Sequence, residues 1–261
     1  MKRLSRIVAP ILGALLLVLS ISGSAFAADK YVALGDSYSA GNGANSTNLD
    51  SSCNRNTYAY PYLLAQQKSL ALTFVACSGA VTGDVINSQV NSVTSDTKLV
   101  TITIGGNDIG FTNLILACTT LGCASQIASS NAQITSTLPA KLNSTFAAIH
   151  AHAPTAQVVV LGYGNPFATP PHTCLAATGV SASEETSLSA LVVNLDNTIK
   201  ARALAAGFSY ADVNPYWSGH DICASNPFTN GLTLFHTADS YHPTRNGYAN
   251  GDVPAIRAII G

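Results

Sequence analysis

Short apolar runs alternate along the chain with longer stretches that have a helical pattern. The runs are rich in β-branched residues and cover residues 31–34, 72–76, 99–104, 157–161 and 208–213. Runs of this length and composition predict buried strands. Strands separated by helical segments are typical of a parallel sheet with helices packed on both faces.

The segments between these runs predict the helices. Helical patterns cover residues 58–68, 82–90, 125–150, 182–206 and 244–260. Gly207 directly follows the fourth of them, where a glycine commonly ends a helix. We therefore expect an α/β fold, a three-layer α/β/α sandwich with a central parallel sheet. No linker-like stretch interrupts residues 28–261, which predicts one domain.

The first 27 residues have a different pattern. Three basic residues occur among the first six, an apolar stretch follows over residues 7–21, and Ala25-Phe26-Ala27 closes it. This order predicts a cleaved secretory signal peptide over residues 1–27. As a membrane helix the apolar stretch is short, about 15 residues where a span needs about 20. We therefore predict a secreted, extracellular protein without a stable membrane anchor after cleavage.

Charged residues are sparse, which narrows the classes of partner. They make up 10% of the sequence, and the formal net charge is −1. A chain without a basic stripe has little to bind a phosphate backbone, so we expect no nucleic-acid partner. We also expect the protein to be a monomer.

All six cysteines follow the predicted cleavage site. An even number of cysteines in an exported chain predicts disulfides. Six cysteines allow 15 pairings, among which neighbours along the chain close the shortest loops. The spacings include no Cys-x-x-Cys pair and no paired Cys/His pattern, so we expect no metal. The cysteines are Cys53, Cys77, Cys118, Cys123, Cys174 and Cys223.

Small and polar residues follow each of the first three predicted strands. These segments read Gly-Asp-Ser at residues 35–37, Cys-Ser-Gly at 77–79 and Gly-Gly-Asn-Asp at 105–108. Ligands of open parallel sheets bind beyond the carboxyl ends of the strands. We therefore expect the three segments to meet at one edge of the sheet and to form the site.

The residues at this edge can supply a serine nucleophile and its base. Ser37 follows a strand end among glycines, which leaves room for a substrate carbonyl to approach its hydroxyl. Among the histidines, His242 is the best candidate base because Asp239 precedes it by three residues. At this spacing the Asp239 carboxylate can reach Nδ1 and select the tautomer that accepts the serine proton. Asp36 is a carboxylate beside the nucleophile, and we interpret it as structural.

The same segments offer donors for a developing oxyanion. The candidates are the backbone N–H groups of Ser37 and Gly79 and the side-chain amide of Asn107. The α/β-hydrolase alternative requires a Gly-x-Ser-x-Gly elbow, but the segment that begins at Gly35 has Ser39 at its fifth position. That alternative is therefore disfavoured.

Four ordered blocks resemble the GDSL or SGNH hydrolase family. They are Gly35-Asp36-Ser37, Gly79, Gly105-Gly106-Asn107-Asp108, and Asp239 followed by His242-Pro243. The blocks span nearly the whole mature chain in the family's order. With the cysteines and the secretion signal, the sequence is most similar to the secreted streptomycete lipases, esterases and phospholipases of this family.

The resemblance implies a flavodoxin-like fold and a serine acyl-enzyme mechanism without a metal or other cofactor. It also implies three sequential disulfides, 53 with 77, 118 with 123 and 174 with 223. Ser37 would be the nucleophile, His242 the base, and Ser37, Gly79 and Asn107 the oxyanion donors. In some relatives a backbone carbonyl two residues before the histidine replaces the acid, and Ser240 has that position here. We favour Asp239, because a carboxylate stabilises the imidazolium that forms.

The resemblance also guides the substrate prediction. We expect esters of lipid type, phospholipids included, with residues 109–116 or Phe167 as candidate walls for the acyl chain. Residues 109–116 are equally well interpreted as a helix that faces the core. One rival is a carbohydrate O-acetyl esterase, although Trp217 is the single tryptophan available to stack on a sugar. The other is a secreted binding protein that has the same fold and no activity.

Overall fold

A computed structural model describes residues 27–120, 122–171, 173–233 and 237–261. Its centre is a sheet of five parallel strands in the order β2-β1-β3-β4-β5. The predicted signal peptide lies outside the described residues, except for its last position, Ala27. The strands are β1 (Lys30–Gly35), β2 (Ala71–Phe74), β3 (Leu99–Thr103), β4 (Gln157–Leu161) and β5 (Ser209–Ala211).

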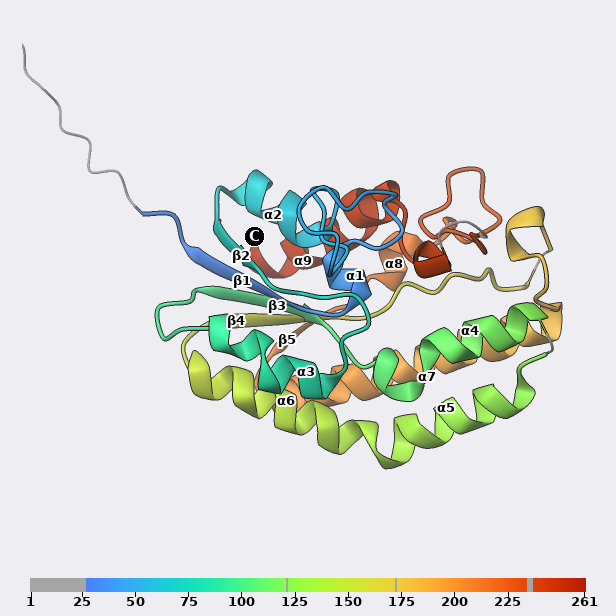
Figure 1. Cartoon of the computed structure of the whole chain (residues 1–261), viewed down its shortest axis with the longest axis horizontal. Helices are drawn as coiled ribbons and strands as arrows, with labels where there is room; N and C mark the ends of the chain where they lie inside the picture. Colours follow the sequence, from blue (N-terminus) through green and yellow to red (C-terminus); the bar gives the residue numbers. More distant parts are fainter. Residues whose placement is uncertain (1–26, 121, 172, 234–236) are drawn as a thin grey trace, which may run out of the picture.

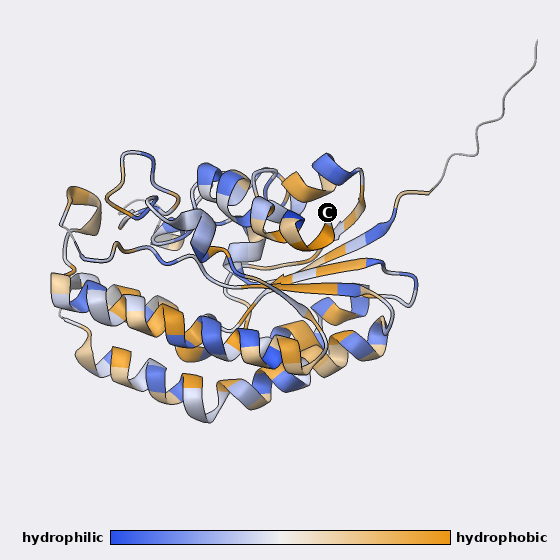
Figure 2. Cartoon of the chain, turned by 180° about the vertical axis from the view of Figure 1, so that it is seen from behind, coloured by the Kyte–Doolittle hydropathy of each residue, from blue (hydrophilic) through white to orange (hydrophobic). Residues whose placement is uncertain are grey.

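Helices cover both faces of this sheet, so the structure is the three-layer α/β/α sandwich that the sequence predicts (Figure 1). On one face lie α2 (Tyr60–Lys68) and α9 (Val253–Ile260). On the other lie α3 (Thr82–Asn87), α6 (Leu138–His152) and α7 (Ala182–Ala205). Each face has its own cluster of buried apolar side chains, and Figure 2 shows hydrophobic residues concentrated along the strands between them. Among the described residues, no helix is long and apolar enough to span a membrane.

The remaining helices lie mostly around the carboxyl ends of the strands. Two of them, α4 and α5, continue past the sheet and pack against each other, and α5 also packs on α7 (Figure 1). These elements are α1 (Ser37–Ala40), α4 (Phe111–Thr120), α5 (Ala124–Ser136), α8 (Asn214–Trp217), the 3₁₀ turns η1 (Gln89–Ser92), η2 (Asn107–Ile109), η3 (Leu175–Ala177) and η4 (Thr237–Asp239), and the π-helix η5 (Gly247–Asp252).

One predicted helix was wrong in its continuity. We expected a single helix over residues 125–150, but α5 ends at Ser136 and α6 begins at Leu138. Pro139 lies in the first turn of α6. Proline has no N–H for a hydrogen bond to the preceding turn, and its ring clashes with the carbonyl four residues before it. The chain therefore starts a new helix there.

Three disulfides tie loops to this framework. They join Cys53 to Cys77, Cys118 to Cys123 and Cys174 to Cys223, which are the pairs that the family resemblance implied. The first bond anchors the segment that follows β2, since Cys77 comes three residues after the strand and two residues before Gly79. It therefore restrains one of the segments expected to form the site.

Candidate active site

Ser37 is placed by the turn that ends the first strand. Asp36 caps α1, and its Oδ1 accepts a hydrogen bond from the Tyr38 N–H at 3.0 Å. Gly35 has φ +123°, and a Cβ there would lie 2.4 Å from both the Ser39 hydroxyl and the Thr103 carbonyl oxygen. Only glycine fits this turn, which leaves Ser37 as the first residue of a short helix at the carboxyl edge of the sheet.

His242 lies directly against this serine. Its Nε2 is 2.7 Å from the Ser37 Oγ, and its Nδ1 is 2.9 Å from the backbone carbonyl oxygen of Ser240. A carbonyl oxygen can only accept, so Nδ1 carries the proton and Nε2 is left to accept the serine hydroxyl. Burial lowers the pKa of His242 to about 4, a shift that the Ser240 carbonyl and the Asp239 charge partly oppose. The imidazole is therefore neutral at pH 7, the form that a general base requires.

The hydrogen bond that we expected from Asp239 is made instead by Ser240. Tyr241 has φ +58°, in the left-handed region, and the His242 N–H closes the turn on the Asp239 carbonyl oxygen at 3.2 Å. This turn directs the Ser240 carbonyl at the imidazole. The Asp239 carboxylate accepts from the Gly43 N–H at 2.7 Å, so it acts on His242 through its charge and not through contact with the ring.

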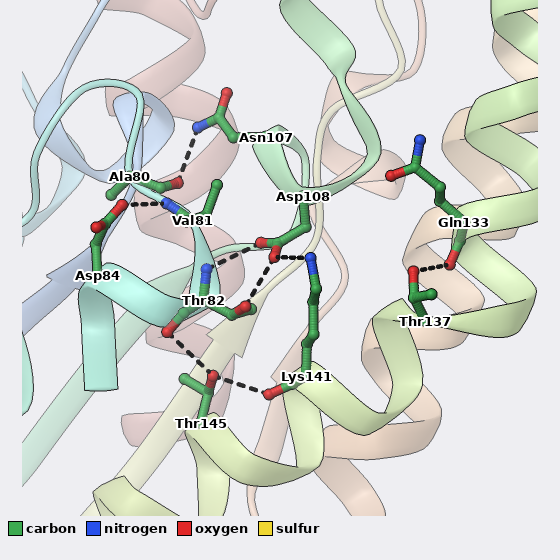
Figure 3. A network of polar contacts seen from close by, with 10 residues as sticks. All are labelled: Ala80, Val81, Thr82, Asp84, Asn107, Asp108, Gln133, Thr137, Lys141 and Thr145. Atoms are coloured by element: carbon green, nitrogen blue, oxygen red, sulfur yellow. Dashed lines mark hydrogen bonds and ion pairs between the residues drawn. The ribbon is translucent and has the colours of Figure 1, made fainter. Parts of the chain in front are cut away.

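The three candidate oxyanion donors border one pocket. Ser37, Gly79 and Asn107 line a cavity of about 410 Å³ together with His242. The Asn107 side chain is held because its Nδ2 donates to the Ala80 carbonyl oxygen at 2.9 Å (Figure 3). An amide nitrogen has two N–H groups, and among the described residues the second one on Asn107 makes no hydrogen bond. It is free to bind a substrate oxygen.

Apolar side chains form the rest of the pocket. Phe111 and Ile115 of α4 line it from one side and Leu232 from another. Leu114, on the same helix, is 1% exposed and packs in the core. One face of α4 therefore packs in the core, as one interpretation of residues 109–116 expects, and another borders the pocket, where a wall for the acyl chain stays a prediction. The expectation for Phe167 was wrong: its ring packs 5.9 Å from that of Tyr241, and the residue borders a separate cavity.

A buried network behind the serine includes a residue that we did not predict. The Tyr163 hydroxyl donates to the Asp36 carboxylate and accepts from the Gly106 N–H at 2.9 Å. Burial raises the pKa of Asp36 to about 7. Asp36 thus has the structural place that we expected, and Tyr163 links the Ser37 turn to the Asn107 turn. Tyr163 comes two residues after β4, so the strand-end argument, applied to the fourth strand as well, would have found it.

The chemistry of this site needs a serine, a histidine and hydrogen-bond donors, all of which the chain supplies itself. Among the described residues, no group of three or more His, Cys, Asp or Glu side chains is arranged to hold a metal ion.

A three-layer sandwich with a serine and a histidine paired at its carboxyl edge defines a class of serine hydrolases. Residues 33–249 match the model of the GDSL-like lipase/acylhydrolase family, and the chain belongs to this family. It is a carboxylic ester hydrolase.

Individual relatives agree with this assignment. "Lipase 1" of Streptomyces coelicolor is 41% identical over 235 residues, which are 88% of this chain and 86% of that protein. The crystal structure of an extracellular lipase from Streptomyces rimosus has a TM-score of 0.84 at 41% identity, over 88% of this chain and 99% of that one. A phospholipase A1 from Streptomyces albidoflavus also has a TM-score of 0.84, at 40% identity over 89% and 99% of the two chains.

Proposed function

We propose that the protein is a secreted hydrolase of lipid-type carboxylic esters that works through an acyl-enzyme on Ser37. The observation that carries the proposal is the contact of Ser37 with a neutral, oriented His242 at the mouth of an apolar pocket. Two relatives bear the printed names extracellular lipase and phospholipase A1, which supports both secretion and a lipid substrate.

In this mechanism His242 Nε2 takes the Ser37 proton as the serine oxygen attacks the ester carbonyl. The oxyanion that forms accepts hydrogen bonds from the Ser37 and Gly79 N–H groups and from the Asn107 amide. The Ser240 carbonyl holds the Nδ1 proton, so the imidazolium cannot turn away from the reacting atoms. His242 then returns the proton to the leaving alcohol, and water, activated by the same base, releases the acid.

The pocket predicts a preference for acyl chains longer than acetate. Each CH₂ buried against Phe111, Ile115 and Leu232 contributes about 0.8 kcal/mol, so we expect kcat/KM for p-nitrophenyl octanoate to exceed that for the acetate by about tenfold or more. Ile115→Trp, which fills the pocket, should remove most of this preference and leave the acetate rate unchanged. Initial rates on the acetate, octanoate and palmitate, set beside acetylated xylan, measure both effects.

Val193→Trp is the matched control for Ile115→Trp. Val193→Trp places the same side chain on the exposed face of α7, outside the pocket, and should leave the profile unchanged. Turnover of p-nitrophenyl acetate and acetylated xylan alone would contradict the lipid proposal and favour the carbohydrate O-acetyl esterase.

The geometry at Asp239 predicts a modest effect for Asp239→Asn. The amide oxygen can still accept from the Gly43 N–H, so the substitution removes the charge and keeps the contact. We expect kcat to fall about tenfold, against about 10⁴-fold where an acid that contacts the histidine is changed. The carboxylate raises the pKa of His242, so its loss lowers that pKa and moves the acid limb of kcat/KM to lower pH. A pH-rate profile from pH 3 to 8 measures the shift.

The exposed Asp96→Asn serves as the control for this measurement, since Asp96 pairs with Lys30 at the opposite edge of the sheet. A loss near 10⁴-fold would show that Asp239 orients the ring in the working enzyme, and an acid limb that stays in place would show that its charge does not act on His242.

A further inference from the structure

The two loops that carry Gly79 and Asn107 are joined by more than one hydrogen bond. Asn107 binds the Ala80 carbonyl oxygen, and the next residue, Asp108, binds Thr82, the first residue of α3. One Asp108 oxygen accepts from the Thr82 N–H at 2.9 Å and the other from the Thr82 hydroxyl at 2.7 Å. Adjacent residues of one loop thus hold both sides of Val81 in the other (Figure 3).

A single cation reaches this junction from a different part of the chain. Lys141 projects from α6 and places its Nζ 3.1 Å from the Asp108 carboxylate (Figure 3). The Asp108 side chain is 1% exposed, while that of Lys141 is 47% exposed. Among the described residues, Lys141 is the one side chain that forms a salt bridge with Asp108. A carboxylate this deeply buried depends strongly on its partner, because loss of the partner leaves a charge that water cannot solvate.

The position of this pair matters because Asp108 directly follows Asn107, one of the candidate oxyanion donors. Without Lys141 the buried carboxylate would be drawn toward solvent, which would loosen its link to Thr82. The amide of Asn107 and the Gly79 N–H would then lose their common alignment, and a misplacement of about 1 Å can cost about 10²-fold in rate.

We propose that Lys141 is a positioning residue, whose ion pair with Asp108 holds the Gly79 and Asn107 donors together. This inference rests on the proposed function of the site. It assigns a role to a half-exposed lysine of α6 that does not line the pocket.

The test is Lys141→Met, assayed on p-nitrophenyl octanoate. We expect kcat to fall about ten- to a hundredfold with KM unchanged, a smaller loss than the 10²- to 10³-fold typical of removing a donor outright. Lys141→Arg keeps the charge and should keep most of the activity. Asp108→Asn and the double variant Asp108→Asn/Lys141→Met are measured beside it. The double variant has no uncompensated charge, so its kcat should be higher than the value obtained by multiplying the losses of the two single variants.

A second readout separates alignment of the donors from a general loss of structure. A trifluoromethyl ketone with an octyl chain forms a tetrahedral adduct on Ser37 whose oxyanion occupies the same donors. Its inhibition constant should rise in Lys141→Met by the factor by which kcat falls. Lys30→Met is the matched control: Lys30 pairs with Asp96, is 54% exposed, and lies at the start of β1, far from the pocket. It should change neither quantity.

Three results would overturn the inference: wild-type kcat in Lys141→Met, a fall in kcat with unchanged affinity for the ketone, or an equal effect of Lys30→Met. Failure of the proposed function looks different. In that case the wild-type protein itself neither hydrolyses the ester nor binds the ketone.

Discussion

Ser37→Ala is expected to lower kcat for p-nitrophenyl octanoate by about 10⁵- to 10⁶-fold, the range found when a serine hydrolase loses its nucleophile. The hydroxyl lies 2.7 Å from His242 Nε2, the nitrogen that takes its proton in the proposed mechanism. Without it no acyl-enzyme forms, and the remaining donors act only on direct attack by water. The measurement is kcat of the purified variant per mole of protein, compared with wild-type protein whose active sites are counted by diethyl p-nitrophenyl phosphate titration.

The organophosphate also gives a readout that is independent of turnover. Wild-type protein should bind one diethylphosphoryl group per chain, on the peptide that contains Ser37, and Ser37→Ala should bind none. Ser187→Ala, an exposed serine of α7, is the matched control and should behave as wild type. A Ser37→Ala variant with more than about 1% of the wild-type kcat would contradict the nucleophile assignment, because loss of a true nucleophile leaves far less.

His242→Gln is expected to cost nearly as much as Ser37→Ala, and the double variant should be no worse than either single one. Residues that act as a unit are strongly non-additive, because a serine without its base is as inert as a base without its serine. The residual activity of His242→Gln should rise with pH, since hydroxide then replaces the missing base. Values of kcat for the two single variants and the double variant, taken from pH 6 to 10, test this.

His220→Gln is the matched control for this substitution. His220 stacks on Phe228, with its ring centroid 3.8 Å away, and makes no contact with Ser37. It should leave kcat unchanged. If the losses in the Ser37 and His242 variants multiplied in the double variant, the two residues would be acting independently, and the shared proton transfer would be excluded.

The three central strands, β1, β3 and β4, could be predicted closely because each is an apolar run buried along nearly its whole length. Gln157–Leu161 was predicted with the bounds that the structure has, and the sheet is parallel as expected. Helix boundaries were harder. The break at Thr137 depends on Pro139, and the segment predicted as a helix over residues 244–260 contains a π-helical turn at Gly247–Asp252. The spacing of apolar residues along the sequence indicates such breaks and π-helical turns only weakly.

The site was predictable as far as it follows from strand ends. Ser37, Gly79 and Asn107 meet because parallel strands bring their carboxyl ends to one edge. The partner of His242 could not be decided in the same way. Asp239 and Ser240 are both close enough along the chain to reach Nδ1 of His242. Which of them does so depends on the left-handed backbone of Tyr241, a conformation that a tyrosine in the sequence does not indicate. The Asp108–Lys141 ion pair could not be predicted either. Its two residues come from separate elements and lie far apart along the chain, so no sequence spacing indicates that they meet.

The distance along the chain between Ser37 and His242 has a consequence for synthesis. Ser37, the proposed nucleophile, comes just after the first strand, Gly79 and Asn107 follow β2 and β3, and His242, the proposed base, comes from the segment just before η5. A ribosome therefore completes the nucleophile early and the base near the end. No amino-terminal fragment that stops before residue 242 contains the serine–histidine pair, so a chain still being synthesised or cut short before that residue cannot hydrolyse esters in the cell that produces it.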